Sequence, residues 1–230
     1  MIDLLDKVKE NTDSALAEIA AAAERAHRKP EDVSIMAVTK THPAEYIEAA
    51  VKCGIRHIGE NRISEGGRKI RLLGKEFAEF HAIGVLHRKE VRQAVRDFHW
   101  LDAIHKIEII EEIARRNASA QILLEINTSG ESAKKGFPPD VVLLESILGR
   151  AFELQLPVRG FLTVGPLCSD SARQRKAFAD LREIRDSLET RLNKSLPELS
   201  MGMSDDFTLA VLEGSTIVRL GRRLFGARGN

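Results

Sequence analysis

The chain has 230 residues, of which 43% are hydrophobic and 30% charged, and its formal net charge is +1. This length suits one large α/β domain or two small ones, and the composition is typical of a globular protein in water. The near-neutral charge gives no electrostatic reason to expect binding of nucleic acid or of an anionic membrane.

Strand and helix patterns alternate along the chain after a first helix. Apolar residues recur at helical spacing from Leu4 to His27, which predicts that N-terminal helix. Short β-branched and apolar runs predict strands at 34–39, 57–59, 80–84, 100–104, 122–127, 158–164, 199–201 and 216–220. The helices predicted between them span 44–53, 63–73, 89–97, 106–117, 139–151, 172–193 and 205–213.

Regular alternation of this kind predicts a parallel sheet covered by helices, and eight repeats close naturally into a barrel. We therefore expect an α/β fold, a (β/α)8 TIM barrel with an additional N-terminal helix. No linker rich in Pro, Gly or Ser divides the chain, so residues 1–230 are predicted to form one domain. A doubly wound open sheet is the alternative, but no GxGxxG follows the first strand.

Lys40 closes the first predicted strand, and Pro43, which suits the first turn of a helix, follows soon after. This places an amine at the C-terminal mouth of the barrel, the face where such barrels carry their chemistry. A desolvated lysine there can lose its proton and attack an aldehyde to form a Schiff base. The alternative is a lysine at the end of the barrel that simply reaches solvent.

Polar residues gather just after several of the predicted strands. Asn61 follows strand two, His81 lies in strand three, and polar segments at 127–131 and 163–166 follow strands five and six. Each segment alone is best explained as an ordinary turn, because Asn, Ser, Gly and Pro dominate turns for local reasons. Their recurrence at one end of successive strands favours a lined pocket.

The loops after the last two strands predict a phosphate site, as in many barrels of this type. Ser204 would supply an N-cap hydroxyl and amides to a helix beginning at Asp205, and Gly221 would let the backbone approach a phosphate. Arg219 alternates with apolar residues, so its guanidinium is predicted to point into the barrel. The alternative for Arg219 is a buried ion pair with Glu125 on strand five.

These motifs together resemble the pyridoxal-phosphate homeostasis proteins, single-barrel relatives of the alanine racemase N-terminal domain. The resemblance runs nearly end to end and keeps its motifs in order. They lie at Ala37–Lys40, Gly59–Arg62, His81–Gly84, Asn127–Glu131 with Lys135–Phe137, Leu162–Pro166, Ser200–Ser204, and Val218–Gly221 with Phe225–Arg228.

By that likeness Lys40 would carry pyridoxal 5′-phosphate as an internal aldimine, and Arg219 would face the pyridine nitrogen. An arginine at that place leaves the nitrogen unprotonated and weakens the ring as an electron sink, which suits carriage or racemisation better than transamination. The likeness implies that the phosphate is held by Ser204, Gly221 and the amide of Arg222, with Ser200 nearby, and that Asn61 and His81 line the cofactor face.

Two features bear on whether the chain is an enzyme. Racemases of this fold use a tyrosine as a second acid or base, and this chain has one tyrosine, Tyr46, early in the helix after strand one. It also lacks the extra β domain of those racemases. Departures from the family pattern stand at Val85–Glu90 and at Arg222, where a hydroxyl residue is usual.

We therefore expect a carrier of pyridoxal 5′-phosphate with little or no turnover. The alternatives are a racemase of low activity and a barrel that binds another phosphorylated metabolite. Expected partners are the cofactor, amino acids and apo-enzymes that use it, with no nucleic acid, membrane or metal, since no metal-binding spacing occurs. Two distant cysteines, no signal-peptide core and no apolar run near the roughly 18 residues of a membrane span predict a cytoplasmic protein, expected as a monomer.

Overall fold

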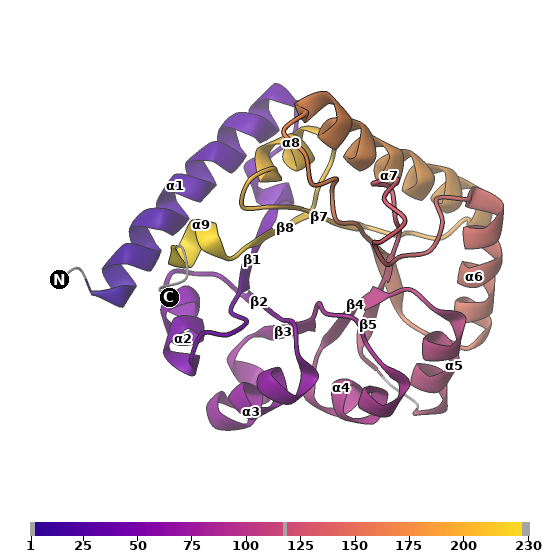
Figure 1. Cartoon of the computed structure of the whole chain (residues 1–230), viewed down its shortest axis with the longest axis horizontal. Helices are drawn as coiled ribbons and strands as arrows, with labels where there is room; N and C mark the ends of the chain where they lie inside the picture. Colours follow the sequence, from indigo (N-terminus) through magenta and orange to yellow (C-terminus); the bar gives the residue numbers. More distant parts are fainter. Residues whose placement is uncertain (1–2, 117–118, 227–230) are drawn as a thin grey trace.

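The computed structural model describes residues 3–116 and 119–226. Eight parallel strands close into a barrel in sequence order, and the helices form a ring around it (Figure 1). This confirms the predicted (β/α)8 barrel. The strands are β1 (Ser34–Val38), β2 (His57–Glu60), β3 (Glu79–Ala82), β4 (Trp100–Ile104), β5 (Gln121–Glu125), β6 (Val158–Leu162), β7 (Glu198–Met203) and β8 (Ile217–Leu220).

The N-terminal helix and the helices predicted between the strands lie close to the expected ranges. They are α1 (Leu4–Arg25), α2 (Ala44–Lys52), α3 (Ile63–Leu73), α4 (Val91–Asp97), α5 (Ile107–Arg115), α6 (Val141–Glu153), α7 (Ser171–Leu192) and α8 (Phe207–Leu212). Sequence periodicity did not predict the short helices, since three or four residues carry no readable period. These are η1 (Pro30–Asp32), η2 (Lys75–Phe77), η3 (Arg88–Glu90) and α9 (Arg222–Phe225).

The extra helix α1 packs on the outside of the ring, along α8 and α9 (Figure 1). Its buried face includes Val8, Ala15 and Ile19, which recur at the spacing of one helical face. Beyond its end, the Arg28 guanidinium donates to the carbonyl of Val211 at 3.0 Å. Asn11 Nδ2 donates to the carbonyl of Leu224 at 2.8 Å, so α1 also holds α9 in place.

Residues of each strand point alternately outward to the helices and inward to the barrel axis. On β1, Ile35 and Ala37 belong to the large apolar layer beneath the helices, whereas Met36 fills the interior. A Cβ on Gly59 of β2 would lie 2.8 Å from Met36 Sδ, so glycine gives that methionine its space. No helix in the described part of the chain combines the length and apolarity that crossing a bilayer requires.

Candidate functional site

Lys40 lies just past the C-terminal end of β1, where the first loop begins. Thr39 before it is fully buried, and Lys40 itself is half-buried. Thr41 after it has a φ of 67°, in the left-handed region that a β-branched residue adopts only when its surroundings impose it. Helix α2 begins at Ala44 as predicted, and Pro43 is its N-cap residue, one position before the first turn.

A buried lysine that the sequence analysis missed supports this loop. Lys69 of α3 is 8% exposed, and its Nζ donates to the carbonyl of Thr39 at 2.9 Å. The same Nζ contacts Glu60 Oε1 at 2.7 Å and Glu65 Oε1 at 2.8 Å. The spacing of Glu65 and Lys69, four residues apart on one helix, was the available signal, but it predicts only a surface ion pair.

The two carboxylates of this cluster have different environments. Glu60 is fully buried and its Oε2 has no hydrogen-bond partner, so burial raises the pKa of Glu60 despite the donors Lys69 and Thr39. For Glu65 burial also acts to raise the pKa, but hydrogen bonds from Lys69 and from the amide of Thr41 outweigh it. The pKa of Glu65 is therefore lowered, and Glu65 holds the negative charge next to the Lys40 loop.

Arg219 of β8 lies inside the barrel, as its alternation predicted, and is 5% exposed. Its NH1 donates to the carbonyl and the hydroxyl of Ser200 at 2.6 and 2.9 Å, and its NH2 donates to the carbonyl of Thr163 at 2.8 Å. These contacts reach two neighbouring strand segments, so the guanidinium joins β6, β7 and β8 across the interior.

The alternative that Arg219 forms an ion pair with Glu125 is wrong within the described residues, because backbone carbonyls take its donors. Burial lowers the pKa of Arg219, while Asp102, Asp206 and Glu125 raise it through their charges at longer range. Burial raises the pKa of Glu125, whose Oε2 has no hydrogen-bond partner and lies 4.0 Å from His105 Nδ1. Asp102 is an acid in an otherwise apolar strand, and this pattern could have predicted charged groups inside the barrel from the sequence.

Ser204, Gly221 and Arg222 lie together where the loops after β7 and β8 meet. The Ser204 hydroxyl accepts from the amide of Arg223 at 3.2 Å, so it caps α9 and not α8 as predicted. The reason is that α8 begins later, after Asp206, whose carboxylate turns back to accept from the Met203 amide at 2.6 Å.

Gly221 leads directly into α9 and lies beside the end of β1. A Cβ on Gly221 would lie 3.4 Å from the carbonyl oxygen of Val38, which is two residues before Lys40. The exposed side chain of Arg222 pairs with Asp205. The loop after β8 therefore adjoins the Lys40 loop at the same mouth, although Gly221 and Lys40 are 181 residues apart in sequence.

His81 of β3 is fully buried, as is Ser200 of β7. Its Nδ1 is 2.9 Å from Asp102 Oδ2, and its Nε2 is 2.9 Å from Nδ1 of His57. Since a carboxylate only accepts, His81 donates from Nδ1 and accepts from His57 through Nε2. Asn61 remains exposed at the mouth, and its carbonyl packs so closely on Gly84 that a Cβ there would lie 1.9 Å away.

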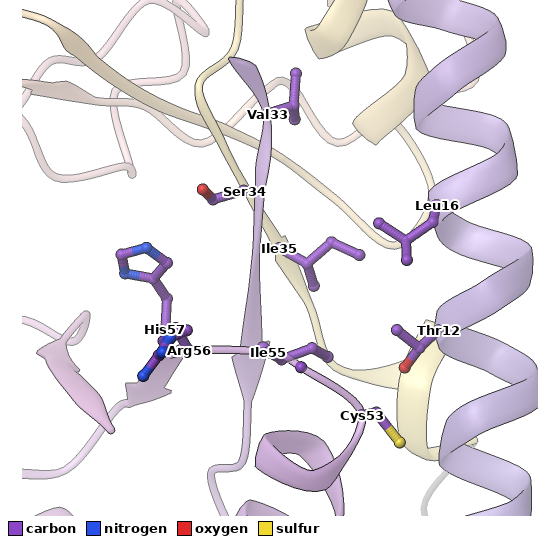
Figure 2. A pocket seen from close by; sticks show the side chains of 10 residues that line it. Thr12, Leu16, Val33, Ser34, Ile35, Cys53, Ile55, Arg56 and His57 are labelled. Atoms are coloured by element: carbon purple, nitrogen blue, oxygen red, sulfur yellow. The ribbon is translucent and has the colours of Figure 1, made fainter. Parts of the chain in front are cut away.

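A cavity of about 250 Å³ lies at the opposite end of the barrel (Figure 2). Ile35, Ile55 and Leu16 supply its apolar lining, and His57 lies on the other side of β1 from Leu16 (Figure 2). None of the predicted site residues lines it. Within residues 3–116 and 119–226, no group of three or more His, Cys, Asp or Glu side chains is arranged to hold a metal ion.

The chain is similar to known proteins over almost its whole length. Residues 11–229 match the alanine racemase N-terminal domain family. A pyridoxal phosphate homeostasis protein of Aquifex aeolicus (strain VF5) is 35% identical, over 95% of this chain and 97% of the relative. Among solved structures, an unknown protein from Bifidobacterium adolescentis has a TM-score of 0.89 at 31% identity, covering 98% of both chains.

A second solved structure was determined with a ligand. PipY of Synechococcus elongatus PCC7942 with PLP bound has a TM-score of 0.77 at 32% identity. The match covers 90% of this chain and 100% of the PipY chain.

Proposed function

Because the chain belongs to the alanine racemase N-terminal domain family, with the pyridoxal phosphate homeostasis proteins as its relatives, we propose that it binds pyridoxal 5′-phosphate. Lys40 holds the cofactor covalently, and the protein serves its intracellular storage and delivery with little or no turnover. The observation that carries this proposal is the place of Lys40, half-buried at the C-terminal mouth of the barrel on the loop after β1. That is where a barrel presents a reactive amine.

The donors around this mouth fit the groups of the cofactor. Ser204, Gly221 and Arg222 hold the phosphate, with Ser200 nearby, because they offer a hydroxyl and backbone free of a side chain. When bound, the cofactor supplies an aldehyde that condenses with primary amines and a ring that withdraws electrons.

Arg219 faces the pyridine nitrogen in this proposal. A guanidinium stays charged and donates hydrogen bonds but accepts none, so it favours an unprotonated ring nitrogen. Asn61 at the mouth and His81 deeper in the barrel complete the set that surrounds the cofactor. Such a site suits carriage, because an unprotonated ring withdraws electrons weakly.

Low turnover is supported by the surroundings of the one tyrosine. The Tyr46 ring stacks on His42 with centroids 4.4 Å apart, and it meets Phe225 edge-on at 5.4 Å. A ring packed in this way serves the contact between α2 and α9. We further infer a cytoplasmic monomer whose partners are amino acids, which release the cofactor, and apo-enzymes that receive it.

The test is covalent capture of the cofactor. Purified protein is mixed with pyridoxal 5′-phosphate, its visible absorption is recorded, and borohydride reduction is followed by peptide mapping. We expect one adduct, at Lys40, and none in Lys40→Ala. Lys89→Ala, which removes an exposed lysine near the same mouth, is the control and should keep the adduct. A colourless wild-type protein, or an adduct at another lysine, would refute the proposal.

A further inference from the structure

The buried charge cluster of Lys69, Glu60 and Glu65 has a use beyond joining α3 to the barrel. We propose that it sets the position of Lys40, which makes Lys69 a positioning residue for attachment of the cofactor. This inference rests on the proposed function of Lys40. It names a residue outside the set that surrounds the cofactor.

The cluster holds the backbone on both sides of Lys40. On the N-terminal side, Lys69 Nζ donates to the carbonyl of Thr39 at 2.9 Å, and the Thr39 hydroxyl donates to Glu60 Oε1 at 2.6 Å. On the C-terminal side, the amide of Thr41 donates to Glu65 Oε1 at 2.7 Å. The two peptide groups that flank Lys40 are therefore tied to one set of side chains.

The backbone at Thr41 needs this support. Its φ of 67° is unfavourable for a β-branched residue, which lacks the freedom of glycine in that region. The hydrogen bond to Glu65 holds the turn in that conformation, and Lys69 in turn holds Glu65 at 2.8 Å. Loss of Lys69 would let the turn relax, and the amine of Lys40 would move with it.

Stability alone does not explain the burial of Lys69. A buried ion cluster adds little stability over a well-packed apolar contact, because each charge loses its hydration. The Lys69 side chain is 10% exposed and that of Glu60 is fully buried, so both are largely desolvated. Geometry at Lys40 is what this arrangement provides and an apolar contact would not.

Lys69→Met tests the inference, since methionine keeps an unbranched side chain and removes the charge. We expect the rate of adduct formation at Lys40 to fall by about tenfold to a hundredfold, as for a misplaced reactive group. Lys176→Met is the matched control, because it removes an ion-paired lysine from the exposed face of α7 and should leave the rate unchanged. Adding Thr41→Gly to Lys69→Met should recover part of the rate, because glycine adopts positive φ without strain.

A measurement on the protein without cofactor separates positioning from folding. The rate at which a small acylating reagent labels Lys40 is followed over pH by peptide mapping. We expect this pH profile to differ from that of the wild-type protein in Lys69→Met and not in Lys176→Met. If Lys69→Met does not fold, Glu65→Ala replaces it, since it frees the Thr41 amide at a partly exposed site. Unchanged labelling and adduct rates in a folded variant would overturn the inference. Failure of the wild-type protein to form any adduct at Lys40 would instead overturn the proposed function.

Discussion

The charged form is favoured for Glu65 at the C-terminal mouth of the barrel, whereas the neutral form is favoured for His57 at the N-terminal end. At the C-terminal mouth, Glu65 accepts hydrogen bonds from Lys69 Nζ and from the Thr41 amide, and these bonds outweigh burial and lower the pKa of Glu65. At the N-terminal end, burial is the largest influence and favours the neutral forms. It lowers the pKa of His57 to about 4 and raises the pKa of the Cys53 thiol.

This difference shows that the proposed site and the groups that mainly affect stability lie at opposite ends of the barrel. The C-terminal ends of the strands meet loops that carry polar groups, while the cavity at the other end is lined in part by Leu16, Ile35 and Ile55. Hydrogen bonds outweigh burial at Glu65, whereas burial is the largest influence on the pKa of His57 and of Cys53. The predictions below test that contrast, beginning with the largest expected effect.

The largest effect is expected for Arg219→Met. This change leaves the carbonyls of Ser200 and Thr163 without their donor, and it removes the cation that offsets the buried acids nearby. We expect a loss of about 3–5 kcal/mol in the free energy of unfolding, measured by urea denaturation. Arg222→Met, which breaks the exposed pair with Asp205, is the control and should cost far less. Similar losses in the free energy of unfolding for Arg219→Met and Arg222→Met would contradict the importance of burial for the effect of Arg219.

The next effect concerns the pH dependence of stability at the N-terminal end. The pKa of His57 is lowered from 6.5 to about 4, first by burial and then by His81, against the opposing charges of Glu79 and Asp102. The folded state thus prefers neutral His57. The contribution of this preference to the free energy of unfolding is fully present above about pH 6.5. It is lost as the pH falls toward 4, where the folded state also takes up the proton.

His57→Gln isolates this contribution, since an amide still donates to His81 but does not titrate. We expect wild-type protein to lose roughly 3 kcal/mol more than this variant between pH 7 and pH 4, measured by urea denaturation at each pH. Parallel curves for the two proteins would show that His57 is not held neutral.

The smallest effect is expected at Cys53, half-buried beside the cavity of Figure 2. Because burial raises the pKa of its thiol, Cys53 should react with iodoacetamide at neutral pH more slowly than a cysteine in a short peptide. Cys53→Ala should change the free energy of unfolding by about 1 kcal/mol or less and leave adduct formation at Lys40 intact. A fall in adduct formation in Cys53→Ala would contradict the placing of the cofactor site at the C-terminal mouth of the barrel.

Sequence periodicity alone predicted the barrel and most of its elements. The first strand was predicted at 34–39 and spans Ser34–Val38, and the helix predicted at 63–73 spans Ile63–Leu73. Lys40 at a strand end and Arg219 pointing inward followed from the same patterns. These features depend on neighbours within a few residues, and such local information is present in the sequence itself.

The contacts that hold these residues were decided only by the tertiary structure. Lys69 lies 30 residues from Thr39, and His81 lies 21 residues from Asp102, so both pairs depend on the register of neighbouring strands and the seating of α3. Ser204 was expected to cap α8, yet it meets Arg223 because the loops after β7 and β8 converge. The last motif was expected to extend to Arg228, which lies outside the described residues. Closure of the barrel brings distant residues together, and no local pattern encodes which of their side chains meet.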